Sequence, residues 1–215
     1  MPDSSELAAR AAEWAGHGFD EGRAALLEDF AAWLIAEAMP AGGLGPREGG
    51  RLWGRHIADS LTFASAWEVP PLEILDVGSG VGLPGIPLAI LWPETEVTLL
   101  DRGGRRIRLL RRAIQVLGLT NVHFAQGDVF DVADTWVGIT FRGSVKPPEA
   151  VGLSARMLVP GGVSVVGLSR REDPPERGRD LIGVAEALGL AARIERVPSE
   201  VLDGAAWLLI MTAGE

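Results

Sequence analysis

The chain has 215 residues, of which 47% are hydrophobic and 23% are charged, and this length and composition predict one globular domain with room for a small extension. The formal net charge of -9 argues against a protein that coats nucleic acid through its overall field. The chain has no cysteine and its three histidines, His17, His56 and His123, have no metal-ligand spacing, so we expect no disulfide framework and no metal.

The N-terminus has acidic residues early and no basic segment followed by an apolar one, so it does not resemble an export signal. No apolar run approaches the roughly 18 residues that are needed to span a bilayer. We therefore expect a cytoplasmic protein without a membrane segment.

The first part of the chain predicts helices. Residues 4–39 are rich in alanine, and apolar side chains recur at helical spacing at Leu26, Leu27, Phe30, Trp33 and Leu34. The glycine- and proline-rich segment PAGGLGPREGG then separates these two helices from a third helical stretch, RLWGRHIADSLTFASAW. We expect residues 1–70 to form an N-terminal helical extension.

From Glu73 onward, short apolar strands alternate with helical segments. The predicted strands are EILDV, EVTLLD, NVHFAQGD, TWVGITF, GGVSVVGLS, ARIERV and AAWLLIMT. This order predicts an α/β fold over residues 71–215, with a doubly wound, seven-stranded, mostly parallel sheet that is covered on both faces. The last two strands are close in sequence, so we expect them to form an antiparallel pair at one edge.

A glycine-rich segment, LDVGSGVGLPGIPLA, follows the first strand directly. Ligands of doubly wound sheets bind at the carboxyl ends of strands near this position, and glycines let the main chain approach a bulky cofactor. Two patterns overlap here. Asp76-x-Gly78-x-Gly80-x-Gly82 suits an S-adenosylmethionine site, whereas Gly80-x-Gly82-x-x-Gly85 formally matches a dinucleotide loop, which is a weak signal by itself.

The segments after the next strands favour the first of these patterns. Asp101 ends the second strand, where a carboxylate can accept both ribose hydroxyls of either cofactor. Gln126-Gly127-Asp128 follows the third strand and offers a carboxylate for an adenine amino group, and Pro160-Gly161-Gly162 predicts a tight turn into the fifth strand. This succession is typical of a class I methyltransferase; the alternative is a glycine-rich turn in an unrelated α/β domain.

The string GSGVGLPGIPLAI, with RHIADSL upstream, resembles the glucose-inhibited division protein B family, which methylates guanine N7 in bacterial small-subunit ribosomal RNA. The resemblance covers residues 20–165. It implies a class I fold with an N-terminal helical cap, S-adenosylmethionine as cofactor, and ribosomal RNA or the small ribosomal subunit as partner of a monomer. The cofactor-binding residues that it implies are Asp76, Gly78, Ser79, Gly80, Gly82, Leu83, Asp101, Arg102, Gly127, Asp128 and Val129.

On the substrate side, the resemblance implies Arg142 as the catalytic residue that positions the substrate, together with Arg55 and His56. Guanine N7 has a lone pair and no proton to lose, so methyl transfer depends on placement more than on a general base. Each basic or aromatic candidate has a structural alternative. His56 can be a hydrogen-bonded core histidine, the arginines of RGGRRIRLLRR can be a solvated helix face, and Trp53 can pack in the core instead of stacking on a base.

The sequence also departs from the family pattern. Arg142 stands in Phe141-Arg142-Gly143 where members usually have a Ser-Arg-Ala type segment, and no lysine follows the fifth strand, which reads VVGLSRRE. These departures leave two alternatives open, a methyltransferase of a small-molecule acceptor and a catalytically silent S-adenosylmethionine-binding module. The overlapping glycine pattern leaves a nicotinamide-dependent oxidoreductase as a third.

Overall fold

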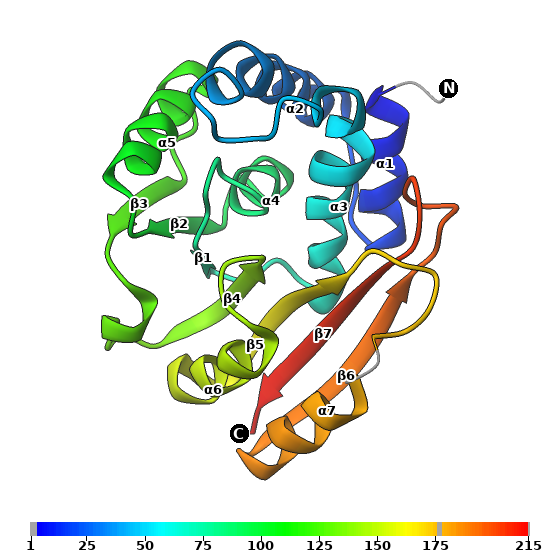
Figure 1. Ribbon diagram of the computed structural model, residues 1–215, viewed down its shortest axis with the longest axis vertical. Coiled ribbons are helices and arrows are strands. Elements are labelled where there is room, and N and C mark those ends of the chain that lie inside the picture. Colours follow the sequence, from blue (N-terminus) through cyan, green and yellow to red (C-terminus); the bar gives the residue numbers. More distant parts are fainter. Residues whose placement is uncertain (1–3, 176–177, 215) are drawn as a thin grey trace.

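The computed structural model describes residues 4–175 and 178–214 (Figure 1). The N-terminal part is helical, as the sequence predicts. Its elements are α1 (Ser4–Trp14), α2 (Glu21–Trp33), η1 (Leu34–Ala38), η2 (Gly49–Arg51), η3 (Leu52–Ile57), α3 (Ala58–Leu61) and η4 (Thr62–Ala66). The third predicted helical stretch is thus a continuous run of short helical elements from Gly49 to Ala66.

The sheet has seven strands in the order β3-β2-β1-β4-β5-β7-β6. Its strands are β1 (Glu73–Val77), β2 (Glu96–Asp101), β3 (Val122–Gln126), β4 (Trp136–Arg142), β5 (Leu158–Ser169), β6 (Leu190–Val197) and β7 (Ala206–Ala213). The strands β1 to β5 are parallel to one another, and β7 is inserted between β5 and β6, antiparallel to both. This arrangement confirms the predicted doubly wound sheet and the antiparallel pair at its edge.

The remaining helices are α4 (Gly85–Leu91), α5 (Gly104–Leu117), η5 (Val129–Asp131), α6 (Pro147–Met157) and α7 (Gly178–Ala187). The helices α1 to α5 lie on one side of the sheet, and α6 and α7 lie on the other (Figure 1). Successive strand residues therefore enter different cores. Ile74 packs toward the first group of helices, and its neighbour Leu75 packs toward the second.

The N-terminal helices share one core with the sheet. Leu27 and Phe30 of α2 are completely buried in the same cluster as Leu88 of α4 and Val97 of β2. Burying a large apolar side chain contributes about 1.5–3 kcal/mol, so these contacts stabilise both parts of the chain together. The boundary between an extension and a methyltransferase unit at residue 70 stays a prediction.

The helix α5 follows β2 and contains the arginine run. Its side chains Ile107 and Leu110 are buried, whereas Leu109 and Ile114 are partly buried against the same core, as the predicted apolar stripe requires. The helix ends at Leu117 and is capped by Gly118, which adopts a left-handed conformation with φ of 64°.

One predicted turn is wrong. Pro160-Gly161-Gly162 was expected to form a turn before the fifth strand, but it lies inside β5, between the pairs Trp136↔Leu158 and Gly138↔Val163. Four residues of β5 thus face one residue of β4, and Gly161 accommodates this bulge with a positive φ of 74°. Within the described residues, no helix has the length and apolar character to cross a membrane.

Candidate active site

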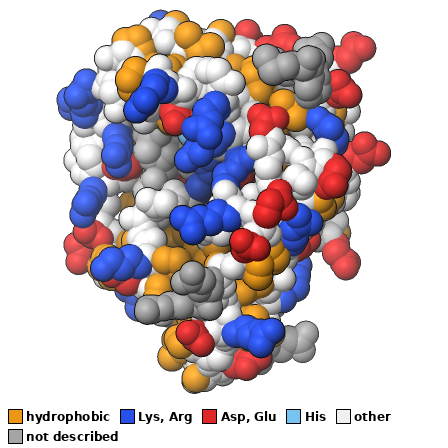
Figure 2. All heavy atoms as spheres, turned by 45° about the vertical axis from the view of Figure 1, so that its right-hand side comes forward, with side chains coloured by type: hydrophobic (Ala, Val, Ile, Leu, Met, Phe, Trp, Pro, Cys, Tyr) orange, Lys and Arg blue, Asp and Glu red, His pale blue; other side chains and the backbone are white. Residues whose placement is uncertain are grey.

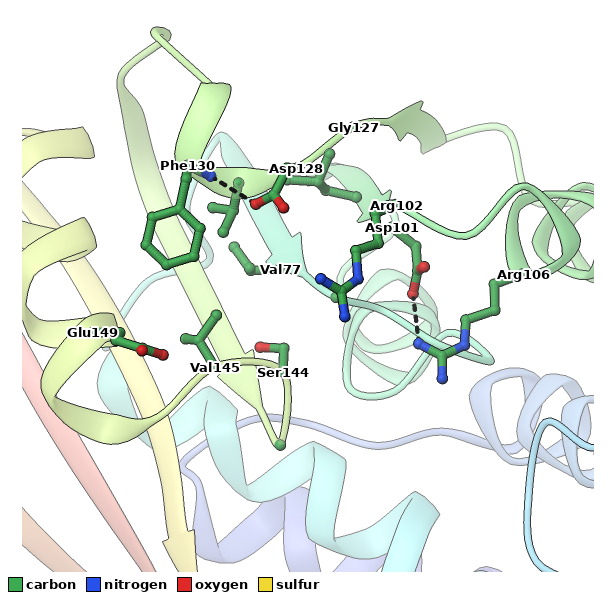
Figure 3. Close-up of a pocket in the computed structure, with 14 residues that line it drawn as sticks. Val77, Asp101, Arg102, Arg106, Gly127, Asp128, Phe130, Ser144, Val145 and Glu149 are labelled. Carbon is green, nitrogen blue, oxygen red and sulfur yellow. Dashed lines mark hydrogen bonds and ion pairs between the residues drawn. The ribbon is translucent and has the colours of Figure 1, made fainter.

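A first cavity of about 430 Å³ opens at the carboxyl ends of β1, β2, β3 and β4 (Figure 3). This is the edge at which doubly wound sheets bind ligands, next to the point where the strand order reverses between β1 and β4. Six of the residues predicted to bind the cofactor line it: Gly78, Asp101, Arg102, Gly127, Asp128 and Val129. They come from three different strand ends.

Asp101, the last residue of β2, forms one wall of the first cavity and is only 2% exposed. Its Oδ1 accepts a hydrogen bond from the Gly103 N–H at 2.8 Å, and its Oδ2 accepts one from the Gly80 N–H at 3.0 Å. The guanidinium of Arg106 also approaches Oδ2, at 3.4 Å, and lies toward solvent (Figure 3). Main-chain donors therefore fix the orientation of this carboxylate.

Asp128 caps the short helix η5 at the other side of the first cavity. Its Oδ1 accepts a hydrogen bond from the Phe130 N–H at 3.1 Å, which leaves its second oxygen toward the cavity region (Figure 3). The apolar side chains Val77, Leu100 and Val129 lie beside it. A carboxylate among apolar side chains suits a ring system that carries an amino group.

Gly78 brings bare main chain to the first cavity. It has a positive φ of 67°, and a Cβ at this position would overlap the Cβ of Ser144. The Oγ of Ser144 is buried, lines the same cavity and has no hydrogen-bond partner within residues 4–175 and 178–214. Because buried hydroxyls are normally paired, this atom points to a polar group of a ligand.

The other five predicted cofactor residues do not line the cavity. These are Asp76, Ser79, Gly80, Gly82 and Leu83. Most of these five residues are buried in or under the glycine-rich loop that follows β1, and they fix the shape of that loop. Gly82, for example, lacks a side chain because a Cβ there would overlap the end of Ile86.

Asp76 is completely buried below this loop. Its Oδ2 accepts a hydrogen bond from the Gly85 N–H at 3.1 Å, and its Oδ1 accepts one from the Thr140 hydroxyl at 3.0 Å. Burial raises the pKa of Asp76 to about 6, because its effect is larger than that of the hydrogen bonds, which lower the pKa. Asp76 thus connects the start of α4 to β1 and β4 and has a positioning role.

A second cavity of about 380 Å³ adjoins the first, and Gly143 lines both. The structure brings together here all three predicted substrate residues, Arg55, His56 and Arg142. Arg55 and His56 come from η3, and Arg142 is the last residue of β4. Residues almost 90 positions apart in the chain thus form one site.

A buried carboxylate organises the second cavity. Asp59 is 6% exposed, and its Oδ2 accepts a hydrogen bond from Arg142 Nε at 3.0 Å. Its Oδ1 lies 3.3 Å from the guanidinium of Arg170, which follows β5. Arg142 also donates from Nη2 to the Arg55 carbonyl oxygen at 2.7 Å. One carboxylate therefore holds two guanidiniums at fixed positions.

His56 completes this network. Its Nε2 lies 2.9 Å from Glu48 Oε2, and its Nδ1 lies 3.4 Å from Arg142 Nη2. Burial lowers the pKa of His56, and the Arg142 charge lowers it further, although the hydrogen bond to Glu48 raises it. A neutral His56 can donate to Glu48 from Nε2 and accept from Arg142 at Nδ1. This bonding is consistent with the structural alternative for His56 and also with a role at the cavity wall.

Several lining residues were missed at the sequence level. In the first cavity these include Arg106, Phe130 and Ser144, and in the second they include Arg170 and Trp207. The signal for Arg170 was present in VVGLSRRE, because an arginine stands close to where a lysine was sought. Trp207 lies far from every motif, and no spacing rule indicated it.

Most arginines of the predicted basic run are exposed along α5. Arg112 pairs with Glu37 at 3.2 Å, and the Arg111 guanidinium lies 4.1 Å above the centre of the Phe124 ring. Trp53 is partly buried against the core and does not line either cavity. Basic side chains spread over the middle of the face shown in Figure 2, and acidic ones gather toward its right-hand edge.

Residues 23–169 match the family described as "rRNA small subunit methyltransferase G", GidB. The chain belongs to the GidB family. Curated proteins named "Ribosomal RNA small subunit methyltransferase G" are similar to it: one from Acidothermus cellulolyticus is 38% identical over 64% of this chain and 62% of its own length. Another, from Cellvibrio japonicus, is 32% identical over 89% of this chain and 85% of its own length.

The match spans 62% of the length of the relative from Acidothermus cellulolyticus, and also 62% of the length of a further relative of the same name from Frankia casuarinae. Solved structures are similar in fold at low sequence identity. The [4+2]-cyclase SpnF matches with a TM-score of 0.62 and 15% identity over 100% of this chain and 97% of its own. A precorrin-6y C5,15-methyltransferase from Geobacter metallireducens matches with a TM-score of 0.54 and 16% identity over 70% of this chain and 84% of its own. The fold of this GidB member is therefore the class I methyltransferase fold.

Proposed function

We propose that this protein is an S-adenosylmethionine-dependent methyltransferase that modifies N7 of a guanine in small-subunit (16S) ribosomal RNA. The observation that carries the proposal is the pair of adjoining cavities. One has carboxylates and apolar walls, the other has three arginines, and Gly143 lines both. Family membership and the similar curated proteins support the substrate class.

The first cavity fits the cofactor. Asp101 at the end of β2 can accept hydrogen bonds from ribose hydroxyls, and Asp128 can accept one from an adenine amino group, with Val129 and Leu100 against the ring. The unpaired Ser144 hydroxyl and the main chain at Gly78 would border the rest of the cofactor, beyond its ribose and adenine. Of the three donors on Asp101, only the exposed Arg106 side chain can withdraw without moving the main chain.

S-adenosylmethionine supplies an electrophilic methyl group on a sulfonium sulfur. Guanine N7 offers a lone pair and has no proton to lose, so this chain does not need a general base for the transfer. The task of its residues is placement. Arg142, held by Asp59 and by the Arg55 carbonyl oxygen, stands beside the shared glycine, where it would orient the acceptor.

The second cavity suits an anionic acceptor. Three guanidiniums and one carboxylate line it, so its local charge is positive in a protein with a net charge of -9. Guanidinium groups bind phosphate oxygens bidentately, and at a reacting guanine phosphate contacts leave N7 free. Because the net charge of the whole chain is negative and the positive charge is local, we infer binding of a specific RNA segment and not general binding of nucleic acid.

The proposal has a direct test. Purified protein would be incubated with S-adenosylmethionine and either small ribosomal subunits or naked 16S RNA from cells that lack this gene, and modified nucleosides would be mapped by mass. We expect one 7-methylguanosine to appear. Methylation of small metabolites alone would favour the small-molecule alternative, and tight cofactor binding without turnover on any acceptor would favour the silent module.

Calorimetry separates the cofactors. We expect heat of binding with S-adenosylmethionine and none with a nicotinamide dinucleotide; the reverse would overturn the proposal. We also propose that the protein acts as a monomer in the cytoplasm, where its RNA substrate is made, and sedimentation analysis of the purified chain tests the first part.

A further inference from the structure

The arginine run at the start of α5 is a strongly charged segment of a chain whose net charge is -9. Residues 102–127 contain six arginines and no acidic residue. All six are exposed: Arg102, Arg105, Arg106, Arg108, Arg111 and Arg112. Such a run is often only a solvated helix face, so the surroundings of each arginine decide whether the run has a partner.

The six arginines differ in what they contact. Arg112 pairs with an acidic side chain of η1 at 3.2 Å, and the Arg111 guanidinium lies 4.1 Å from the centre of a phenylalanine ring of β3. Arg102, Arg105 and Arg108, by contrast, have no ion pair among the residues that the structure describes. These three form what we call the α5 arginine row. Their positive charge is not neutralised within the described part of the chain.

The α5 arginine row begins at the first cavity. Arg102 lines that cavity and lies at its open side (Figure 3). A Cβ on Gly104 would lie 3.3 Å from the Gln126 side-chain amide nitrogen and 3.8 Å from Arg108 Nη1, so Arg108 approaches the carboxyl end of β3. That strand end also belongs to the first cavity. The row therefore continues the rim of the cavity outward along the helix.

Arg105 and Arg108 share one side of α5. Residues three positions apart on a helix are neighbours. The buried side chains Ile107 and Leu110 face the core from the other side of the helix. The two guanidiniums thus stand next to each other on the solvent side, where they can reach neighbouring phosphates of one strand.

A second basic segment borders the other cavity. Arg55 lines the second cavity, and Arg51 is exposed four residues before it. Positive charge therefore flanks both cavities. Figure 2 shows basic side chains from the left-hand edge of its face to the middle. A polyanion that lies across the two openings would meet guanidiniums on both sides.

We propose that the α5 arginine row binds the phosphate backbone of the RNA substrate beside the modified guanine. This inference rests on the proposed function and deepens it, because it assigns a surface to the RNA outside the second cavity. Guanidiniums bind phosphate oxygens bidentately, and phosphate contacts fix the position of a nucleic acid without reading its sequence. The row thus supplies affinity, and the second cavity holds the base that is modified.

The test measures how the affinity for RNA depends on salt. Labelled 16S RNA from cells that lack this gene, naked and in small ribosomal subunits, would be titrated by filter binding at several salt concentrations. Each phosphate contact on a single strand contributes about 0.7 to the slope of log Kd against log salt, so Arg105→Gln with Arg108→Gln should lower this slope by about 1.4. The affinities should converge near about 1 M salt, which makes the Kd of this variant roughly 25-fold higher at about 0.1 M.

The matched control removes the same charge at the opposite edge of the sheet. Arg179 on α7 and Arg193 on β6 are exposed at the β6 edge, whereas α5 packs at the β3 edge. Arg179→Gln with Arg193→Gln should leave the Kd for RNA and its slope as in wild type. Arg105→Lys with Arg108→Lys keeps both charges and should keep most of the affinity. Neither Arg105 nor Arg108 lines the first cavity, so the Kd for S-adenosylmethionine should not change in any variant.

Three outcomes would overturn the inference. The glutamine variant on α5 could stay within about twofold of the control, the lysine variant could be as weak as the glutamine variant, or wild type could bind neither form of the RNA. Unchanged RNA affinity together with lost binding to vesicles of anionic lipid would assign the row to a membrane surface instead.

Because binding is measured without a methyl donor, this test is separate from that of the proposed function. A wild-type protein that binds the RNA with the expected salt dependence but methylates nothing would overturn the proposed function and leave the inference standing. A protein that methylates the RNA equally well with and without Arg105 and Arg108, at unchanged Kd, would do the reverse.

Discussion

The two adjoining cavities are built in different ways. The first depends on main-chain geometry at consecutive strand ends: glycines bring the backbone close, and N–H groups of Gly80 and Gly103 hold Asp101. The second depends on ion pairs between distant segments, with Asp59 of α3 holding Arg142 at the end of β4 and Arg170 after β5. A cavity built on backbone tolerates side-chain change around it, whereas a cavity built on ion pairs can be changed by a single substitution.

The largest effect is expected in the ion-paired cavity. Arg142→Met removes the guanidinium that we propose orients the acceptor, while Asp59 keeps its pair with Arg170. A hydrogen bond to a charged group contributes about 1.5–3 kcal/mol. We expect kcat/KM for RNA methylation to fall roughly 100-fold, with the Kd for S-adenosylmethionine unchanged. The control is Arg112→Met, which breaks an exposed pair with Glu37 and should leave both values as in wild type. An equal loss of cofactor binding in Arg142→Met would show that the two cavities are not independent.

The next effect concerns Asp76 below the first cavity. Burial raises its pKa from 3.8 to about 6, so the folded chain keeps a proton that the unfolded chain loses in this range. The free energy of unfolding should therefore fall by about 3 kcal/mol as the pH rises through this window. Denaturant titrations at several pH values should show this loss in wild type and not in Asp76→Asn. Parallel pH profiles for the two proteins would contradict the prediction.

A smaller effect is expected at the backbone of the first cavity. In Gly78→Ala the new Cβ would overlap Ser144, which must shift within the cavity wall. We expect a cost of about 2 kcal/mol, or roughly 30-fold weaker binding of S-adenosylmethionine by calorimetry. Gly118→Ala is the control, because its φ of 64° is similar and its Cβ would meet nothing within 4 Å. If both variants bind the cofactor equally, Gly78 serves only the conformation of the loop.

The smallest effect is expected at His56. Here the free energy of unfolding should fall as the pH falls, which is the opposite of the pH dependence expected from Asp76. Burial lowers the pKa of His56 below its ordinary 6.5, so the unfolded chain takes up a proton first as the pH falls. The stability that the buried, neutral His56 contributes is complete above pH 6.5 and is lost as the pH drops through the pKa of His56 in the folded chain. Wild type should lose stability relative to His56→Asn in mildly acidic buffer, by thermal unfolding. An identical acid dependence in both proteins would contradict the buried, neutral histidine.

The first cavity was largely predictable because its signals are local. A carboxylate at the end of β2 and another after β3 converge on one edge in any parallel sheet, so Asp101 and Asp128 were identified from position alone. The glycine loop was harder to interpret. Only Gly78 of its four glycines lines the cavity, while Gly82 and Gly85 make room for the protein's own side chains.

In the second cavity, the residues that were predicted are those that the family resemblance implied. Arg55, His56 and Arg142 were expected there and are found together. Arg170 and Trp207 were missed because their placement depends on which strand lies beside β5, a long-range property that the antiparallel insertion of β7 decides. Local sequence patterns contain no information about that pairing. The turn at Gly161 was misread for a similar reason, since a bulge depends on the register of the neighbouring strand.

Gly143 has a consequence for inhibitor design. It lines both cavities, has a positive φ of 66°, and a Cβ there would meet nothing within 4 Å. The passage between the two compartments is thus bounded by a residue that projects nothing into it. A molecule that joins an adenosine to a purine through a short tether would occupy both compartments at once, and the high effective concentration of its second half would make it bind far more tightly than either half alone.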